Sequence, residues 1–378
     1  MWLFFALITI TLFLSKIIGY SSERKSKLYI SIIFGILSFF MMFRGFHVGN
    51  DTDIYSHLYD VINNYSNLPL FIQNTRYELG YVYLNRIIGS IFHNRQWLFI
   101  ITGGFTAFSF GRFIYQYSEM PWLSAIMFLT LQFFDLSMSS IRQVVAISIL
   151  MFAYDYVVKK KPIPFILLVL LAYLFHTSSI IFLLIYPLSN LELNYKFYFY
   201  SICVAIGIFF TFSSFLKLVG RVFPRYVHYL TESSNSYSNT AKLANVLMLC
   251  LYLILFILIK YSEKNRIIEK HSLSNDKRLL NIYFENASNI HALAVWIGII
   301  LLFFSLQGTI LNRFKYVCSF PLLVAYPNAL KHINNPKNRN ALSLFSVIVF
   351  ISYILIIYIF RPEWQSTYPF VPFWRDYE

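Results

Sequence analysis

Long apolar runs recur along the whole chain and are separated by short polar loops. Several of them approach the roughly 20 residues that cross a bilayer as an α-helix. Polar or proline-containing segments bound the runs, and we predict spans near residues 2–20, 28–43, 97–114, 121–137, 141–158, 162–175, 177–189, 197–216, 242–260, 289–307, 313–330 and 341–360. The pattern predicts an all-α fold, a polytopic helical membrane protein with about 11–12 transmembrane helices.

Three of these assignments rest on a further argument. We divide 162–175 from 177–189 because a single span there would put the later basic loops on the wrong side of the membrane. The first run lacks a small-residue cleavage site and a second span follows it directly, so we expect a permanent helix and not a signal peptide. The segment Tyr77–Phe92 has an apolar stripe that Asn85 and Arg86 interrupt, which favours an interfacial or re-entrant helix over a span.

The composition agrees with a membrane location. Of the 378 residues, 58% are hydrophobic, 20% are aromatic and only 13% are charged, which leaves too few polar side chains to coat a globule of this size. No tandem repeat or linker interrupts the pattern, so we treat residues 1–378 as a single integral membrane domain. Within it we expect outer-face segments at 44–96, 217–241 and 361–378 and a cytoplasmic loop at 261–288.

The net charge of +14 would suggest a nucleic-acid partner in a soluble protein, but here the basic residues alternate with the spans. Positive-inside orientation explains the charge without nucleic acid. The loops that we assign to the cytoplasm carry Lys16, Arg24, Lys25, Lys27, Arg112, Lys159, Lys160, Lys161, Lys196, the basic residues from Lys260 to Arg278, Lys331, Lys337 and Arg339. Both termini are then expected on the outer face.

The expected outer face also carries polar residues that invite a chemical interpretation. Arg44, Asp51 and Asp53 lie in a loop that follows the second span and leads into an amphipathic helix. The structural alternative is that one aspartate caps this helix and that Arg44 anchors a lipid phosphate. Further polar residues fall on the same face, at the ends of other predicted helices: Arg76, Glu78, Arg142, Gln143, His176 and Arg313.

Charged side chains cost about 2.5–3.5 kcal/mol at the centre of a membrane helix, so these residues should face protein or water. Structural alternatives apply here too: hydrogen bonds between helices for Arg142 and Gln143, a satisfied turn for His176, and interfacial snorkelling for Arg313. The aromatic tail Trp364–Trp374 either stacks on sugars or lies in the aromatic belt, which is the simpler interpretation. Together, several arginines beside carboxylates suit a polyanionic lipid head group, because a guanidinium group pairs with phosphate oxygens in a bidentate way.

Five short motifs, in this order, resemble the EpsG family of membrane proteins. They are Arg44 with Val48-Gly49-Asn50-Asp51-Thr52 and Tyr55, then Glu78-Leu79-Gly80-Tyr81, Ile141-Arg142-Gln143 with Ala146, Phe175-His176-Thr177-Ser178, and Asn312-Arg313-Phe314 with Tyr316. Asn50 departs from the pattern, since a small residue or threonine is expected before the aspartate. The family is grouped with the Wzy-type polymerases, which make bacterial O-antigen or exopolysaccharide. O-antigen is the glycan of lipopolysaccharide.

The resemblance implies an enzyme, a membrane glycosyltransferase of the GT-C type that works at the outer, periplasmic face of the bacterial inner membrane. Its donor and acceptor would be undecaprenyl-diphosphate-linked glycans. Membrane lipids, a chain-length regulator and a flippase are the further partners that we consider, and no nucleic acid is expected. The product would be O-antigen or exopolysaccharide.

In this scheme the basic and amide residues bind the diphosphate and stabilise the charge that grows on it: Arg142 and Arg313, helped by Arg44, Arg76 and Gln143. A carboxylate or imidazole takes the proton of the acceptor, and the candidates are Asp51, Asp53, Glu78 and His176. No metal-binding spacing accompanies these residues, so we expect no cofactor, although two aspartates could hold Mg²⁺ together with water and phosphate.

Two other classes of function fit an arginine-lined site. A flippase or transporter of lipid-linked sugars would place its substrate near the membrane midplane and show internal pseudo-symmetry, whereas these charges gather at one face. An O-antigen ligase-like enzyme would deliver glycan to lipid A core, and an acyl-transferring enzyme would need a thioester or acyl-phospholipid donor. An assay of substrates separates these possibilities.

Overall fold

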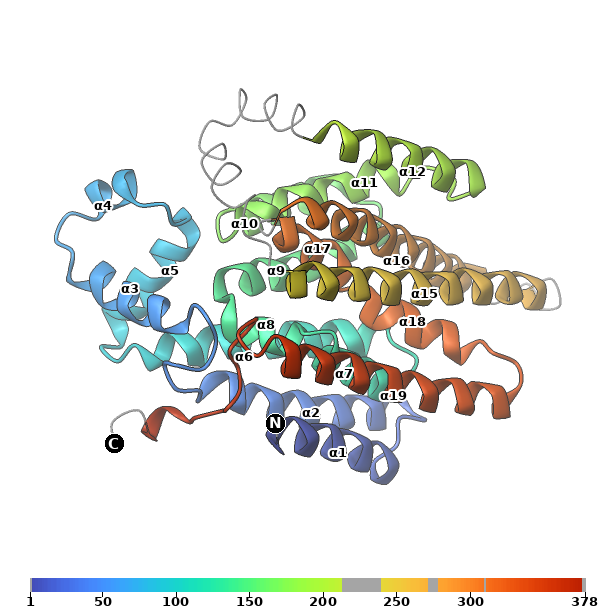
Figure 1. The fold of residues 1–378 in the computed structure, drawn as a ribbon, viewed down its shortest axis with the longest axis horizontal. Coiled ribbons are helices and arrows are strands. Elements are labelled where there is room, and N and C mark those ends of the chain that lie inside the picture. Colours follow the sequence, from blue (N-terminus) through green and yellow to red (C-terminus); the bar gives the residue numbers. More distant parts are fainter. Residues whose placement is uncertain (1, 213–238, 271–277, 309–310, 376–378) are drawn as a thin grey trace. The chain divides into compact units, whose positions relative to one another are not determined.

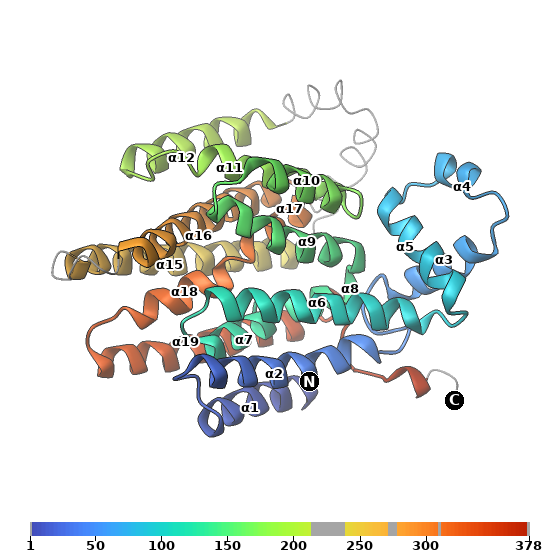
Figure 2. The same cartoon turned by 180° about the vertical axis from the view of Figure 1, so that it is seen from behind.

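A computed structural model describes residues 2–212, 239–270, 278–308 and 311–375 of the chain. In these residues all regular elements are helices (Figures 1 and 2), apart from one isolated β-bridge between Arg44 and Pro372. The all-α, polytopic fold that the apolar pattern predicts is therefore confirmed. The structure groups the chain into two compact units, Met1–Asp155 with Ile163–Ile180 and Asn334–Glu378, and Tyr156–Pro162 with Ile181–Ile333. The single integral membrane domain stays a prediction.

Six described helices are long and apolar enough to cross a membrane. They are α2 (Glu23–Met42), α6 (Gln96–Tyr117), α9 (Ile141–Val158), Ala241–Ser262 of α15 (Asn239–Lys270), Ala287–Gln307, which begins in α16 (Arg278–Phe304), and α19 (Pro336–Phe360). A seventh span results if α7 (Pro121–Thr130) and α8 (Phe133–Ser139), which meet at 51°, cross together.

The predicted number of spans is higher because it includes shorter apolar helices. These are α1 (Trp2–Ile17), α10 (Pro162–Tyr173), the segment Thr177–Leu188 formed by η1 (Thr177–Leu184) and α11 (Ile185–Leu188), and α12 (Tyr195–Phe210). The span predicted at 313–330 is two helices, α17 (Asn312–Ser319) and α18 (Leu322–Lys331), which are separated at Pro321. Proline lacks the amide hydrogen that a continuous helix needs, which is why the apolar run divides there.

In the first unit, α2 and α6 pack side by side and antiparallel (Figure 2). The amide of Gln96, at the start of α6, donates to the carbonyl oxygen of Met42 at 2.6 Å, and the hydroxyl of Tyr115, near its end, donates to Glu23 at 2.8 Å. Burial of aromatic side chains stabilises this pair against α7, where the rings of Phe34 and Phe110 lie 5.3 and 4.7 Å from that of Phe128.

The two ends of these helices differ in charge. One end, which we call the basic end, carries Arg24, Lys25, Lys27, Arg112, Lys337 and Arg339. Arg112 forms an ion pair there with Asp155 near the end of α9, and Tyr117 donates to the same carboxylate at 2.7 Å. The other end, which we call the Arg44 end, holds the loop after α2, the start of α6 and the start of α9.

Three short helices continue the chain at the Arg44 end: α3 (Thr52–Asn64), α4 (Leu68–Asn74) and α5 (Leu79–Ile91). Helix α5 has 13 residues, about 20 Å, which is too short for a span and fits the predicted interfacial helix. One face of α5 is buried, and the other exposes Leu79, Tyr83, Ile87 and Ile91. Arg86 does not point into lipid, because its guanidinium donates to the carbonyl oxygens of Ile62 and Asn63 at the end of α3.

The second unit is built on α15, α16, α17 and α18, with α12 packed on α16. The indole of Trp296 lies 5.1 Å from the ring of Tyr198 and 5.0 Å from that of Phe256, and its Nε1 donates to Ser201 at 2.9 Å. This unit also contains Arg313, which is exposed in the first turn of α17.

Candidate functional site

An ion pair between Arg142 and Glu78 is the centre of the polar cluster at the Arg44 end. Arg142 lies in the first turn of α9, and Glu78 occupies the N-cap position of α5, where its side chain makes no capping hydrogen bond. The two side chains are 16% and 12% exposed. The positive end of the α9 dipole disfavours an arginine there, so the carboxylate of Glu78 offsets both the charge and the dipole.

Tyr55 connects this pair to Asp51. The Nε of Arg142 donates to the hydroxyl of Tyr55 at 3.5 Å, and that hydroxyl donates to Oδ2 of Asp51 at 3.4 Å. The guanidinium also lies 5.8 Å from the ring centroid of Tyr55 and 5.0 Å from that of Tyr77. Aromatic faces stabilise a guanidinium group while leaving its edge for anions. We call Asp51, Tyr55, Glu78 and Arg142 the Arg142 network.

The turn that contains His176 joins the network through the backbone. The amide of Thr177 donates to Oε1 of Glu78 at 3.4 Å. The amide of Gly80 donates to the carbonyl oxygen of Leu174 at 2.8 Å, and a Cβ at Gly80 would lie only 2.8 Å from that oxygen. The start of α5 is therefore held closely against this turn, and Glu78 with it.

His176 is buried, and its imidazole is oriented by the next turn of the chain. The amide of Ser178 donates to Nδ1 at 3.3 Å, and the hydroxyl of Ser178 lies 2.6 Å from the same nitrogen. Since Nδ1 accepts a hydrogen bond, the proton of the neutral imidazole belongs on Nε2. These contacts agree with the satisfied-turn alternative for His176, and its role as a base stays a prediction.

The structure contradicts the capping alternative for Asp51. Asp51 does occupy the N-cap position of α3, but its carboxylate makes no capping hydrogen bond. The neighbouring hydroxyl of Thr52 instead donates to the carbonyl oxygens of Val48 and Met138, at 2.7 and 2.9 Å. Asp51 is half-buried beside Tyr55, and Asp53 is exposed in the first turn of α3.

Arg44 lies deeper than the sequence suggests. Its side chain is 0% exposed, its Nη1 donates to the carbonyl oxygen of Met41, and its guanidinium lies 4.5 Å from the ring centroid of Phe99. In the part of the chain that the structure describes, its Nε and Nη2 have no hydrogen-bond partner. Burial lowers the pKa of Arg44 to about 9, and the nearby Tyr81 and Tyr55 oppose the decrease. Arg44 remains charged at neutral pH, and its diphosphate-binding role stays a prediction.

The other predicted residues are more widely distributed. Arg76 is exposed, with its guanidinium 5.6 Å from the ring of Tyr77, and Gln143 is buried on α9. Arg313 belongs to the second unit. The structure therefore joins Glu78 and Arg142 directly, Asp51 to them through Tyr55, and the turn of His176 through the backbone amide of Thr177, whereas Asp53 is exposed.

Sequence reasoning missed Tyr55 as the residue that links Asp51 to Arg142. The spacing of Asp51 and Tyr55 does indicate their contact, because residues four apart share one face of a helix. The contact between Glu78 and Arg142 had no such signal, since 64 positions separate them. In the described residues, no group of three or more His, Cys, Asp or Glu side chains could hold a metal ion, and metal independence stays a prediction.

A tight connection between the loop after α2 and the C-terminal tail positions Asp51. The amide of Gly49 donates to the carbonyl oxygen of Ser366 at 2.8 Å, and that of Asn50 donates to the carbonyl oxygen of Gln365 at 3.1 Å. Gly49 has φ +98°, and a Cβ there would clash with the carbonyl oxygen of Met138. Only glycine fits this close approach of the loop to the end of α8.

Comparison with known proteins supports the resemblance seen in the motifs. The model of the EpsG family matches residues 27–372, a range that includes every residue of the Arg142 network, the turn at His176 and Arg313. No curated protein and no solved structure matches the chain. The match covers nearly the whole sequence, and the chain therefore belongs to the EpsG family, which suggests a membrane protein of the exopolysaccharide or O-antigen polymerase type.

Proposed function

We propose that this protein is a membrane glycosyltransferase that polymerises undecaprenyl-diphosphate-linked oligosaccharide repeat units at the periplasmic face of the bacterial inner membrane. Family membership supports the polymerase type. The observation that carries the chemistry is the guanidinium group of Arg142, which Glu78 and Tyr55 hold at the end of a membrane helix.

The charges at the two ends of α9 support the proposed orientation. Arg142 opens this 18-residue helix, which is about 27 Å long, and Lys159, Lys160 and Lys161 follow its other end. Lysine-rich loops favour the cytoplasmic side of a membrane. The Arg142 network then faces the periplasm, where lipid-linked repeat units are presented to a polymerase of this kind.

In the proposed reaction, a hydroxyl oxygen of the acceptor attacks the anomeric carbon of the donor glycan. The bond from that carbon to the phosphate oxygen breaks, and undecaprenyl diphosphate leaves with the electron pair. Arg142 binds this diphosphate and stabilises its growing negative charge, with Arg76 and Gln143 as further proposed ligands. The role of Arg313, which belongs to the second unit, stays a prediction from the sequence. Transfer of the hydroxyl proton to a protein base completes the step.

Asp51 is the best placed of the four proposed bases. Both carboxylate oxygens of Glu78 are engaged, one by Arg142 and one by the amide of Thr177. His176 is buried, with Nδ1 engaged by Ser178. Asp51 is half-buried, belongs to the network and contacts only the hydroxyl of Tyr55 among the interactions described above. A carboxylate in this environment can accept a proton and return it to solvent.

Incubation of the purified protein with synthetic undecaprenyl-diphosphate repeat unit, followed by gel analysis of the products, tests the proposal. We expect a ladder of products for the wild type and an elongation rate about 10²–10³-fold lower for Arg142→Ala. Arg142→Lys should keep partial activity, because lysine keeps the charge but cannot bind phosphate in a bidentate way. Arg95→Ala is the matched control, because Arg95 pairs with Asp60 at the same end, outside the network. If the Arg142→Ala protein elongates glycan as fast as the wild type, the proposed role of Arg142 is wrong. Parallel reactions with EDTA test metal independence.

One observation favours a transporter as the second candidate. Transporters often use discontinuous helices, and α7 and α8 are bent by 51° at a break within one apolar segment. Proteoliposomes separate the two functions. A transporter would move lipid-linked repeat units across the bilayer without lengthening them, whereas a polymerase lengthens them on one side. A ligase-like or acyl-transferring enzyme would require lipid A core or an acyl donor in the same assay.

A further inference from the structure

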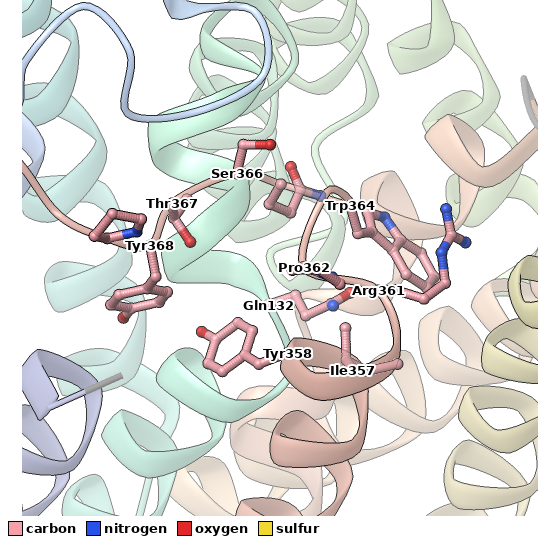
Figure 3. Close-up of a pocket in the computed structure, with 11 residues that line it drawn as sticks. Gln132, Ile357, Tyr358, Arg361, Pro362, Trp364, Ser366, Thr367 and Tyr368 are labelled. Atoms are coloured by element: carbon pink, nitrogen blue, oxygen red, sulfur yellow. The ribbon is translucent and has the colours of Figure 1, made fainter.

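A pocket of about 280 Å³ opens where the C-terminal tail crosses the break between α7 and α8 (Figure 3). It is lined by Gln132 at the break, by Ile357 and Tyr358 at the end of α19, and by the tail residues Arg361, Pro362, Trp364, Gln365, Ser366, Thr367, Tyr368 and Pro369. All of these residues belong to the first unit. Its volume is near the lower limit of small-molecule sites, which suits one sugar ring better than a whole repeat unit.

The lining combines aromatic rings, uncharged polar groups and one arginine, Arg361. Figure 3 shows Tyr358 and Tyr368 on one side and Trp364 with Arg361 on the other, with the side chain of Gln132 between them. A sugar ring has apolar C–H faces and a rim of hydroxyls, so aromatic rings, amides and hydroxyls together recognise it. The guanidinium of Arg361 lies 4.8 Å from the ring of Trp364 and pairs with Glu363 at 3.0 Å. The rim is therefore close to neutral, which favours an uncharged sugar.

A buried carboxylate keeps two of the lining residues in place. Asp135 is 0% exposed and accepts hydrogen bonds from the hydroxyl of Tyr358 at 2.8 Å and from that of Thr367 at 2.7 Å. The rings of Tyr358 and Tyr368 lie 5.0 Å apart. The wall of the pocket is thus fixed before a ligand arrives, and a preformed site loses less entropy when it binds.

The pocket adjoins the Arg142 network through the loop after α2. Trp364, Gln365 and Ser366 are residues of the pocket lining. Their backbone carbonyl oxygens accept hydrogen bonds from the side chain of Asn50, the amide of Asn50 and the amide of Gly49, in that order. Asp51, the proposed base, is the next residue along the chain, about 3.8 Å from Asn50 between Cα atoms. A sugar in the pocket therefore lies on the tail segment that is hydrogen-bonded to Asn50, the residue before the proposed base.

We propose that this pocket binds one neutral sugar residue of the acceptor repeat unit and holds it next to Asp51. The inference rests on the proposed polymerase function, because the acceptor is the partner that must present a hydroxyl to the base, whereas the diphosphate of the donor needs Arg142. Trp364 is then a specificity-determining residue for the acceptor and not for the donor.

A binding measurement tests the pocket independently of catalysis. Methyl glycosides of glucose, galactose, rhamnose and N-acetylglucosamine are titrated against the purified protein, with methyl glucuronide as the charged comparison, and tryptophan fluorescence is recorded. We expect at least one neutral glycoside to change the emission of the wild type and of Arg142→Ala, and this change to be lost in Trp364→Phe. Trp374→Phe is the matched control, because Trp374 lies in the same tail and does not line the pocket. Equal responses of the wild type and Trp364→Phe, or no response to any glycoside, would overturn the inference.

A kinetic measurement then assigns the bound sugar to the acceptor. We expect Trp364→Leu to raise the KM for the acceptor about tenfold, because one stacked contact is lost, and to leave the KM for the donor unchanged. The control variant Trp374→Leu should have the same KM for the acceptor as the wild type. Failure of the wild type to elongate any lipid-linked substrate would count against the polymerase function. An unchanged acceptor KM in an enzyme that does elongate would count against the pocket alone.

Discussion

Arg142 and Glu78 lie 64 positions apart in the sequence and form an ion pair in which each group occupies the start of a helix. The positive ends of two helix dipoles meet at this pair, so the carboxylate is favoured and the guanidinium is disfavoured at the same place. Glu78 therefore offsets the cost of holding the charged guanidinium group of Arg142 in a partly buried position.

Replacement of Glu78 by glutamine should destabilise the protein. The amide keeps the size of the side chain but leaves the guanidinium of Arg142 without its counter-charge, which costs about 1–3 kcal/mol. Thermal unfolding in detergent measures the change, with Glu363→Gln as the control, because Glu363 forms an exposed ion pair. An unfolding midpoint equal to that of the wild type would show that the pair contributes nothing to stability.

Exchange of the two charges separates stability from catalysis. The double variant Glu78→Arg with Arg142→Glu should recover part of the stability that each single variant loses, because an ion pair forms again in the same place. It should not elongate glycan, since the guanidinium no longer stands at the start of α9. Recovery of activity together with stability would mean that only the presence of a pair matters, and not which residue carries the positive charge.

Asp51→Asn should lower the elongation rate by about 10²–10⁴-fold if the carboxylate is the base that we propose. It should cost little stability, because the side chain of Asp51 makes no capping hydrogen bond to α3. Asp60→Asn on the same helix is the control, since Asp60 is 45% exposed and pairs with Arg95. Rates and unfolding midpoints of both variants are compared. A large loss of stability in Asp51→Asn with a normal rate per folded molecule would assign Asp51 a structural role instead.

Arg44 makes the stability depend on pH in a direction that is unusual for an arginine. Its pKa is about 9 in the folded protein against an ordinary value of 12.5, so between these values the unfolded chain holds more protons than the folded chain. Stability therefore increases with pH in that window, and burial of the charge reduces stability below it. We expect the unfolding midpoint of the wild type, relative to that of Arg44→Met, to rise from pH ~8 to pH ~10. If the difference in unfolding midpoint between the wild type and Arg44→Met stays constant over this pH interval, the pKa of Arg44 is not lowered.

Gly49→Ala should lower the stability by at least about 2 kcal/mol, because alanine disfavours a positive φ and its Cβ would clash with the carbonyl oxygen of Met138. Gly19 supplies the control: it also has a positive φ, +70°, but a Cβ there meets nothing within 4 Å. Gly19→Ala should cost only about 1 kcal/mol, the backbone part alone. Similar unfolding midpoints for the two variants would mean that the loop moves away from α8 at little cost.

Much of the fold could be predicted from the sequence because hydrophobic patterning determines it. The apolar runs predict the helices of both units, and the interrupted stripe at Tyr77–Phe92 predicts the short amphipathic helix α5. The bend between α7 and α8 could not be predicted, since neither glycine nor proline marks it. Gln132 adopts a left-handed conformation there, with φ 67°, and packing around the bend is not visible in a local pattern.

The candidate site could be predicted less well, because it depends on contacts between distant segments. Charge and position indicate that Asp51, Glu78 and Arg142 share a face of the membrane, but they do not indicate that Tyr55 links them or that Arg44 is fully buried. The pocket beside the network was equally hidden. The sequence favours the interfacial belt for the aromatic tail, and it does not indicate that Gly49 and Asn50 donate hydrogen bonds to this tail.

The hydrogen bond from Asn50 to Trp364 joins residues that are 314 positions apart. A ribosome adds about 5–20 residues per second, so the partner of this loop is synthesised roughly 15–60 s after the loop itself. During that interval Asp51 has no fixed neighbour on the tail side, however early α2 and α6 enter the membrane. The loop that carries Asp51 therefore reaches its final geometry only after the tail segment that contains Trp364 has been synthesised.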